Sequence, residues 1–521
     1  MQRAPCAARK HRLANDMQSI FDNGPQAPCP KPFNMAAHVL SQSHIWPDKI
    51  ALQILHSDHC EDWTYRDLEA AVLGIAAGLL ENDAQIGDLI LMRLGNTVDY
   101  PLTYLGALAA GLVPVPTSAA LKLPEVERII EELSPKLIVR DAAVTCPETS
   151  NQIRLPQLQA MRDLPPVDYH MGDPERLGYV VYTSGTSGKP RAVAHAHRAI
   201  WARQMMFEGW YGLRSEDRVL HSGAFNWTYT MGTGLMDPWT IGATAMITAA
   251  GTQSDSLPTL LANNDATIFA AAPGVYRQLL RGCETLTLPN LRHGLSAGEK
   301  LPSATRTAWN KATGMPIFEA YGMSECSTFL SGSPAQPALG DRLGQPQTGR
   351  RIAILGTDGP VPRGSEGTIA VHKRDCGLMK GYLKAPEETA AKMQGDWFLT
   401  GDQGIMHDDG QISYLGRDDD MMNAGGYRVS PIEVEQAFNS YPGMVAVAVT
   451  QVEVKADTYV IAAFYTGPAT LDEAKVNDHA SNHLARYKQP RLYIHIDALP
   501  LGANGKILRK ILRDRYAQEN H

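Results

Sequence analysis

The sequence lacks the features that mark several specialised classes of protein. Its seven cysteines lie far apart and include no C-x-x-C pair, which argues against a zinc site and indicates reduced thiols in a cytoplasmic protein. Acidic residues outnumber basic residues by 55 to 48, giving a net charge of -7. The chain therefore has no basic excess with which to bind nucleic acid.

Long apolar runs are also lacking. The most apolar stretch, residues 101–121, is interrupted by Pro114 and Pro116, so it predicts a buried helix followed by a strand rather than a membrane span. Neither low-complexity tracts nor internal repeats stand out. What remains is the composition of a globular protein, and 521 residues are too many for one ordinary hydrophobic core, so we expect at least two domains.

The pattern of apolar, polar and turn-forming residues changes along the chain. Residues 1–35 begin with a basic stretch that no apolar segment follows, and they are expected to form a flexible extension, with an organelle presequence as the alternative. Helical periodicity, as in residues 65–80, then alternates with short apolar strands such as residues 89–94 and 137–139. Short β segments separated by turn signals occupy residues 340–415.

A second boundary is predicted at the charged run of residues 416–420, for which a solvated linker is the alternative. We therefore predict an α/β fold in which residues 36–415 form a large N-terminal domain of α/β layers with a β-rich subdomain. Residues 416–521 are expected to form a small, mobile α+β domain.

A loop rich in glycine and small hydroxyl residues lies at residues 182–190, which read Tyr-Thr-Ser-Gly-Thr-Ser-Gly-Lys-Pro. Glycines let backbone N–H groups turn inward, hydroxyls add donors and the lysine adds a positive charge, so the loop predicts phosphate binding after a strand at residues 177–182. It is not a Walker A loop, because Thr183 stands where that motif needs glycine and Pro190 where it needs Ser or Thr. A flexible surface loop is the alternative.

Five further blocks follow this loop in order. They are Tyr321-Gly322-Met323-Ser324-Glu325, Thr400-Gly401-Asp402, Gly416-Arg417-Asp418-Asp419, Gly425-Gly426-Tyr427-Arg428-Val429 and Asn504-Gly505-Lys506. In order and spacing, residues 36–515 resemble the adenylate-forming superfamily, which includes acyl-CoA and aryl-CoA synthetases, peptide-synthetase adenylation domains and beetle luciferases. The resemblance implies that a carboxylate joins the α-phosphate of ATP, releasing pyrophosphate, and that the acyl group then passes from AMP to a thiol.

The resemblance also implies a site for ATP and Mg²⁺. Its ATP- and AMP-binding residues would be Thr183, Ser184, Gly185, Thr186, Ser187, Gly188, Lys189, Ala297, Gly298, Glu299, Tyr321, Gly322, Ser324, Asp402, Arg417 and Lys506. The loop would hold the β- and γ-phosphates, Glu325 would hold Mg²⁺, Tyr321 would stack on adenine, and Asp402 would accept hydrogen bonds from the ribose hydroxyls. Core packing, turns and ordinary surface positions are the alternatives.

The resemblance implies that the catalytic residues are Lys506, Glu325 and Thr186. Lys506 would bridge the incoming carboxylate and the α-phosphate, and it must leave before a bulky thiol can enter. Asp419 occupies the hinge position for that movement. Coenzyme A would then meet four residues, namely Gly425, Gly426, Tyr487 and Lys488.

The acyl pocket is expected to be mostly apolar. Its candidate residues are Trp227, Thr228, Met231, Gly298, Gly322 and Met323. Peptide-synthetase domains place an aspartate in this block to hold an α-amino group, but residues 223–232 contain no acid, so an amino-acid substrate is disfavoured. Trp227 lies fifteen residues before Gly242, which is similar to acetyl- and medium-chain acyl-CoA synthetases.

We therefore predict an AMP-forming acid:CoA ligase that acts on a medium-chain or aromatic acid and uses ATP, Mg²⁺ and coenzyme A. Loading of a carrier-protein phosphopantetheine is the second hypothesis, and a non-catalytic nucleotide sensor is the third. Neither nucleic acid nor a membrane is an expected partner. The sequence leaves the oligomeric state open, with a homodimer among the alternatives.

Overall fold

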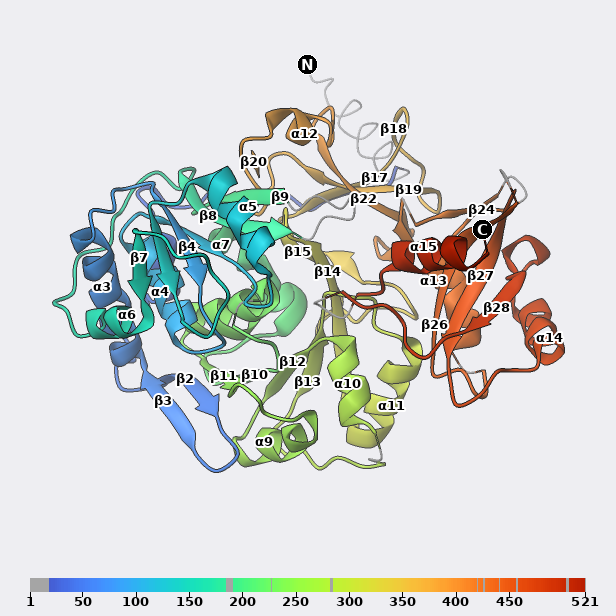
Figure 1. Ribbon diagram of the computed structural model, residues 1–521, viewed down its shortest axis with the longest axis horizontal. Helices are drawn as coiled ribbons and strands as arrows, with labels where there is room; N and C mark the ends of the chain where they lie inside the picture. Colours follow the sequence, from blue (N-terminus) through green and yellow to red (C-terminus); the bar gives the residue numbers. More distant parts are fainter. Residues whose placement is uncertain are drawn as a thin grey trace, which may run out of the picture.

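The computed structural model describes residues 18–520 apart from residues 184–190, 226, 282–283, 419, 425–426, 440, 456–457 and 503–505. Figure 1 shows a large N-terminal domain, coloured blue to light orange, with a smaller C-terminal domain beside it in orange and red. Within the described ranges, no helix has both the length and the apolar character that a membrane crossing requires.

A central sheet runs through the large domain in the order β16-β15-β14-β13-β12-β10-β11-β2-β3. Its strands are β2 (Ile50–Leu55), β3 (Cys60–Thr64), β10 (Arg218–His221), β11 (Thr244–Thr248), β12 (Ile268–Ala271), β13 (His293–Ser296), β14 (Ile317–Met323), β15 (Ser327–Ser331) and β16 (Gln345–Pro346). The pairs from β2 to β14 are parallel and the outer pairs are antiparallel. The inner strands read as short apolar runs because helices cover both faces of a parallel sheet.

Helical segments accompany this sheet along the chain. They are α7 (Ala199–Arg203), η1 (Phe207–Tyr211), η2 (Thr230–Met236), α8 (Asp237–Ile241), η3 (Ser254–Ser256), α9 (Leu257–Asn263), α10 (Pro273–Leu279) and α11 (Ser303–Thr313). Both η1 and η2 are π-helices, a form that occurs mostly as short insertions and often at functional sites.

A smaller parallel sheet lies beside the central one in the order β5-β4-β6-β7. Its strands and helices are α2 (Met35–Val39), α3 (Tyr65–Glu81), β4 (Leu89–Arg93), α4 (Asp99–Ala109), β5 (Val113–Pro116), α5 (Leu123–Leu133), β6 (Leu137–Arg140), β7 (Gln152–Arg154) and α6 (Leu155–Met161). Helix α3 begins where the Thr64 hydroxyl accepts the Asp67 N–H, and it buries residues three or four apart, such as Leu68, Val72 and Ile75.

An antiparallel sheet of β20-β9-β8 carries the predicted phosphate loop. It consists of β8 (Leu177–Thr183), β9 (Arg191–Ala196) and β20 (Gly381–Tyr382), and α12 (Pro386–Ala390) follows β20. The register pairs Thr183 with Arg191, so these two residues flank the undescribed residues 184–190.

The β-rich subdomain is an antiparallel sheet built on β17, β19 and β22. Its strands are β1 (Ile20–Asp22), β17 (Arg351–Gly356), β18 (Gly359–Pro360), β19 (Glu366–His372), β21 (Met393–Gln394), β22 (Trp397–Met406) and β23 (Ile412–Arg417). Strand β23 continues through Gly416 and Arg417, two residues past the boundary expected from the sequence.

Part of the predicted N-terminal extension is packed into the fold, which corrects the expectation of flexibility for its described residues. Strand β1 pairs with β17. Asn34 is fully buried, and its Oδ1 accepts the N–H of Ala36 at 2.8 Å while its Nδ2 donates to the Leu108 carbonyl at 2.8 Å. This segment is ordered by partners far away in the sequence, so its own residues carry no local signal of it.

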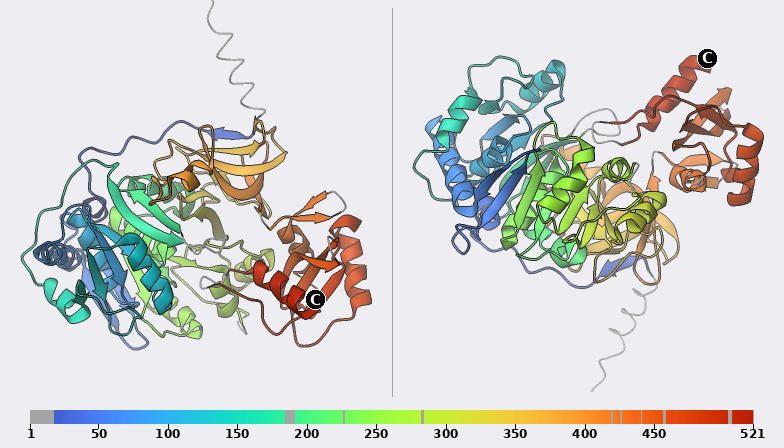
Figure 2. Two further views of the ribbon diagram at one scale, coloured as in Figure 1. Left: turned by 45° about the horizontal axis from the view of Figure 1, so that its top comes forward. Right: turned by 90° about the horizontal axis from the view of Figure 1, so that it is seen from below.

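The C-terminal domain is built on the sheet β26-β27-β28 and the hairpin β24-β25. Its elements are β24 (Met422–Ala424), β25 (Tyr427–Val429), α13 (Pro431–Phe438), β26 (Ala446–Lys455), β27 (Thr458–Thr466), α14 (Glu473–His483), η4 (Arg486–Lys488), β28 (Leu492–His495) and α15 (Arg509–Asn520). Both views in Figure 2 show this domain set to one side of the larger one.

Candidate active site

A buried carboxylate, that of Asp402, lies at the centre of the predicted ribose site. Asp402 is only 5% exposed, and the β22–β23 register places it opposite Arg417. The hydroxyl of Tyr321, on β14, donates to Asp402 Oδ2 at 2.5 Å, and the hydroxyl of Tyr414 donates to Oδ1 at 3.2 Å. The Arg417 guanidinium is 3.7 Å from Oδ2. Two sheets therefore meet at this carboxylate.

The neighbours of Asp402 only partly offset the effect of burial on its carboxylate. Burial raises its pKa above the ordinary value of 3.8, and Arg417, the Tyr321 hydrogen bond, Lys506 and the Tyr414 hydrogen bond only partly oppose that rise. A group that is buried, surrounded by donors and still short of compensation is a candidate for binding a polar ligand.

Lys506, from the C-terminal domain, acts on residues of the large domain. Its positive charge lowers the pKa of Asp402 and that of Glu299. Burial is nevertheless the largest influence on Glu299 and leaves its pKa raised, with Arg277 opposing it more than Lys506 does. The exposed Lys506 is thus within electrostatic range of both predicted nucleotide-binding carboxylates.

Glu325 is linked through Tyr382 to β9, the strand that follows the predicted phosphate loop. Tyr382, on β20, donates its hydroxyl to Glu325 Oε1 at 2.7 Å. The guanidinium of Arg191 lies 5.1 Å from the centre of the Tyr382 ring and pairs with Glu388 at 2.8 Å. Since Arg191 is the first residue of β9, this contact joins the strand after the loop to the predicted metal-binding carboxylate.

The backbone near Tyr321 explains why residue 322 is a glycine. A Cβ atom on Gly322 would lie 2.2 Å from the Ser327 carbonyl oxygen, and the β14–β15 ladder shifts register between Tyr321 and Gly322. Glycine is therefore required by the close approach of β15. The Ser324 carbonyl accepts a hydrogen bond from His195 Nε2 at 2.7 Å, which fixes the turn before Glu325.

Among the acyl-pocket candidates, Gly298 lies against Trp227, whereas Met231 and Met323 pack in two different core clusters. Gly298 has a φ of +94°, and a Cβ there would lie 3.2 Å from Trp227 Cζ2, so the Ala297-Gly298-Glu299 segment passes directly over the indole. Thr228 is exposed. Met231 is 5% exposed and packs in the main hydrophobic core, while Met323 packs at the edge of another core cluster.

Asp237, the first acid after the Trp227 block in the sequence, is already neutralised. Its Oδ2 is 2.6 Å from Arg203 Nη2, its Oδ1 accepts from Arg203 Nε at 2.8 Å, and the Tyr211 hydroxyl donates to Oδ2 at 2.7 Å. Asp237 is fully buried. A carboxylate occupied in this way is not free to hold the amino group of a substrate.

The two described residues predicted to bind coenzyme A interact within the C-terminal domain. Lys488 forms an ion pair with Glu433 on α13, and its ammonium lies 5.6 Å from the centre of the Tyr487 ring. The remaining predicted residues lie outside the described residues: Ser184, Gly185, Thr186, Ser187, Gly188, Lys189, Asp419, Gly425 and Gly426. For Thr183 only the backbone, at the end of β8, is described.

Three residues near the site are absent from the prediction made from the sequence. Tyr414 donates to Asp402, Tyr382 donates to Glu325, and Arg191 lies over Tyr382. The signal for Arg191 was available, because a second cation follows Lys189 at the end of the phosphate loop. The two tyrosines reach the site only through strand pairing between distant segments.

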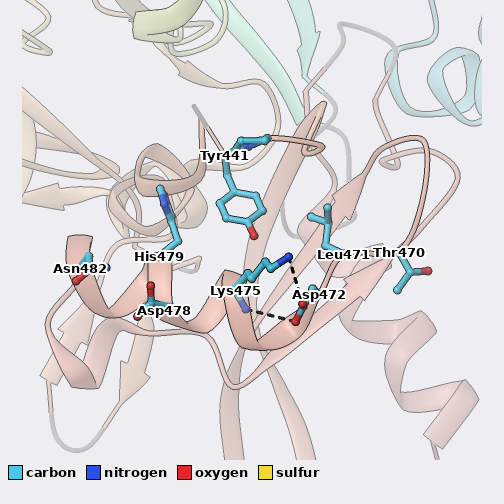
Figure 3. Close-up of a pocket in the computed structure, with 9 residues that line it drawn as sticks. Tyr441, Thr470, Leu471, Asp472, Lys475, Asp478, His479 and Asn482 are labelled. Atoms are coloured by element: carbon cyan, nitrogen blue, oxygen red, sulfur yellow. Dashed lines mark hydrogen bonds and ion pairs between the residues drawn. The ribbon is translucent and has the colours of Figure 1, made fainter.

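A pocket of about 550 Å³ on the C-terminal domain does not belong to this site. Figure 3 shows Tyr441, His479 and the Lys475–Asp472 pair around it, the two charged groups being 3.7 Å apart. None of the residues predicted from the sequence lines it.

Two family models match the chain. The AMP-binding enzyme model matches residues 40–383, and the AMP-binding enzyme C-terminal domain model matches residues 433–506. The human protein acyl-coenzyme A synthetase ACSM2A, mitochondrial, is 28% identical over 492 residues, covering 87% of this chain and 84% of the relative. The 3-hydroxybenzoate–CoA ligase of Aromatoleum sp. (strain CIB) is 28% identical over 478 residues, covering 87% and 91%.

Solved structures share the fold. The anthranilate CoA ligase AuaEII, in complex with anthranoyl-AMP, has a TM-score of 0.85 at 24% identity and covers 94% of this chain and 99% of its own. A benzoate CoA ligase from Burkholderia xenovorans LB400 has a TM-score of 0.81 at 25% identity, covering 92% and 100%.

The large α/β domain, the small C-terminal domain and the two family models together define an adenylate-forming enzyme. The chain belongs to the AMP-binding enzyme family, in its branch of acyl-CoA synthetases.

Proposed function

We propose that this enzyme joins a medium-chain or aromatic carboxylic acid to coenzyme A, through an acyl-AMP intermediate. The named relatives support this range, since they include a human acyl-coenzyme A synthetase, a ligase for 3-hydroxybenzoate and a ligase for benzoate. The neutralised Asp237 supports it too, because this carboxylate is not free to hold the amino group of an amino-acid substrate.

The observation that carries the proposal is the effect of Lys506 on two carboxylates of the other domain. Because its charge acts on Asp402 and Glu299, the arrangement supports a role for Lys506 in the first half-reaction. There its ammonium would bridge the acid and the α-phosphate while negative charge builds up between them.

The chain's other residues would hold ATP in a fixed orientation. Asp402 would accept the ribose hydroxyls with lone pairs that Tyr321 and Tyr414 leave free, since a carboxylate offers about four acceptor sites. Arg417 would supply a fixed charge beside the ribose. The loop from Thr183 to Lys189 would hold the departing pyrophosphate, and we add Arg191 to that group because it begins the strand after the loop.

The residues present fit a Mg²⁺ ion held mainly by the substrate. Among the described residues no group of three or more His, Cys, Asp or Glu side chains could hold a metal. Mg²⁺ commonly binds one carboxylate together with phosphate oxygens and water. Glu325 would be that carboxylate, oriented by Tyr382, and the ion would neutralise phosphate charge.

The second half-reaction needs Lys506 to withdraw so that the thiol can enter. We propose Asp419 as the hinge, Gly425 and Gly426 as the channel wall, and Tyr487 and Lys488 as contacts for the nucleotide part of coenzyme A. Lys488 would have to leave Glu433 to do so. Transfer to a carrier-protein phosphopantetheine is the second candidate, because the same thiol chemistry serves both acceptors.

The test is acid-dependent release of AMP, measured with ATP, Mg²⁺, coenzyme A and a panel of aliphatic and aromatic acids. Lys506→Ala should abolish adenylation and should retain most thioester formation from supplied acyl-adenylate. Lys475→Ala is the matched control, because Lys475 is an exposed lysine of the same domain that pairs with Asp472. It should leave both half-reactions intact.

Two results would contradict the proposal. Absence of AMP release with every acid would exclude the ligase activity. Equal loss of both half-reactions in Lys506→Ala would exclude the separation of roles between the two domain positions. Faster turnover with a phosphopantetheinylated carrier protein than with coenzyme A would favour the second candidate.

A further inference from the structure

Two polar atoms without hydrogen-bond partners belong to aromatic side chains that pack against Trp227 and against each other. They are the Nε2 atom of His221 and the hydroxyl of Tyr229, both buried and without a hydrogen-bond partner in the described part of the chain. The Tyr229 ring lies edge to face with the His221 ring at 4.4 Å and with the Trp227 ring at 5.1 Å. The three rings therefore form one cluster.

The position of this cluster points to a ligand. His221 is the last residue of β10, at the carboxyl end of the parallel strands, where open α/β sheets bind their ligands. Tyr229 immediately precedes the π-helix η2. On its other side Trp227 lies under Gly298, so the cluster continues inward from the proposed acyl pocket.

The hydrogen bonds of His221 fix which nitrogen carries its proton. Its Nδ1 accepts the Gly223 N–H at 2.9 Å, so Nδ1 must keep its lone pair. Burial lowers the pKa of His221 to about 3, which keeps the ring neutral near pH 7. The single ring proton is therefore on Nε2, and this atom is a donor without an acceptor.

Leaving such groups unpaired has a cost. A buried donor or hydroxyl without a partner is unfavourable by about 1–3 kcal/mol. An all-hydrocarbon acyl chain would leave both groups unpaired, whereas a polar substituent within hydrogen-bond reach would satisfy them. Contact of the His221 N–H with the face of the Tyr229 ring is the alternative use of this donor.

We propose that the acyl group of the substrate carries a hydrogen-bonding oxygen or nitrogen, which accepts from His221 Nε2 and exchanges a hydrogen bond with the Tyr229 hydroxyl. The substrate class would be hydroxy-, amino- or oxo-substituted acids of aromatic or similar size. This inference rests on the proposed ligase function and narrows its substrate.

The test compares kcat/KM for acids that differ by one substituent. The panel is benzoate with its three hydroxy and three amino isomers, and octanoate with a hydroxyoctanoate. We expect at least one substituted acid to exceed its unsubstituted parent by about 10- to 100-fold. Tyr229→Phe and, separately, His221→Phe should reduce that ratio toward one.

Tyr276→Phe is the matched control. Its hydroxyl is also buried, but it donates to the Phe269 carbonyl at 2.9 Å or the Leu295 carbonyl at 3.0 Å. Tyr276→Phe should lower the Tm and leave the ratio unchanged, whereas Tyr229→Phe should change the ratio with little effect on the Tm.

The possible outcomes distinguish this inference from the proposed ligase function on which it rests. AMP release with unsubstituted acids at least as fast as with every substituted acid would overturn the inference and retain the ligase function. A high ratio that neither Tyr229→Phe nor His221→Phe alters would also overturn it. Failure of every acid to release AMP would overturn both.

Discussion

Replacing Asp402 by Asn should weaken ATP binding without weakening the fold. The substitution keeps the shape of the side chain and removes its charge. Burial raises the pKa of Asp402 despite the nearby Arg417 and Lys506, so the protein without ligand loses little by giving up the ionised carboxylate. Stability that comes with a raised carboxyl pKa is fully present at low pH and is lost as pH rises through the folded-state pKa. At neutral pH the uncharged Asn side chain should not incur this loss of folding stability.

The expected loss of ATP affinity follows from the hydrogen bonds available. Tyr321 and Tyr414 already donate to Asp402, and the amide oxygen of Asn can still accept from one of the ribose hydroxyls. The variant therefore loses about one charge-assisted hydrogen bond, worth about 1.5–3 kcal/mol. This corresponds to about a 10- to 150-fold increase in KM for ATP.

The assay is acid-dependent AMP release over a range of ATP concentrations, together with thermal unfolding without ATP. KM for the acid should change far less than KM for ATP. Tyr414→Phe is the control for the surrounding network, because it removes one donor at 3.2 Å and leaves the charge. An unchanged KM for ATP in Asp402→Asn, or a Tm several degrees lower, would refute the assignment of Asp402 to the ribose.

The pH dependence of ATP binding should follow the same carboxylate, with KM for ATP rising as pH falls toward the raised pKa of Asp402; the profile of Asp402→Asn should be flatter, and identical profiles would exclude the link. Asp237→Asn should destabilise the large domain by about 3–5 kcal/mol in urea unfolding because it leaves Arg203 buried and unpaired, whereas the double change Arg203→Met with Asp237→Leu should recover most of that loss. Gly298→Ala should cost about 1–2 kcal/mol for its positive φ and raise KM for bulky acids more than for small ones. Tyr382→Phe should raise the Mg²⁺ concentration needed for half-maximal rate about 10-fold, since it frees Glu325 from its orienting donor; an equal effect of Mg²⁺ on both enzymes would contradict this.

Periodic and contiguous features could be predicted from the sequence. Helix α3 follows from apolar residues three or four apart, such as Leu68, Val72 and Ile75, and β8 follows from a short apolar run before a glycine-rich loop. The division into α/β layers, a β-rich region and a small C-terminal domain could be predicted from changes in the pattern of apolar and turn-forming residues along the chain. These signals are local, so a single sequence contains them.

Features made by distant partners could not be predicted in the same way. Strand β1 has three residues and forms only because β17, more than three hundred residues later, pairs with it. Tyr414 and Tyr382 reach Asp402 and Glu325 through strand pairing, and no spacing rule links them. The cluster of His221, Trp227 and Tyr229 depends on how side chains pack at the end of a sheet, which a sequence motif does not encode.

Three buried carboxylates of the large domain differ in how closely a protein cation compensates their charge. Asp237 lies 2.6 Å from Arg203, and Asp375 lies 2.5 Å from Arg350, with both side chains of the second pair fully buried. Asp402 has its cation, Arg417, at 3.7 Å, beyond hydrogen-bond distance. The first two charges are compensated by the protein itself, so replacing one partner should affect stability. The third accepts from two tyrosine hydroxyls and retains acceptor sites. We therefore expect its remaining partners to come from a ligand, so replacing it should affect binding.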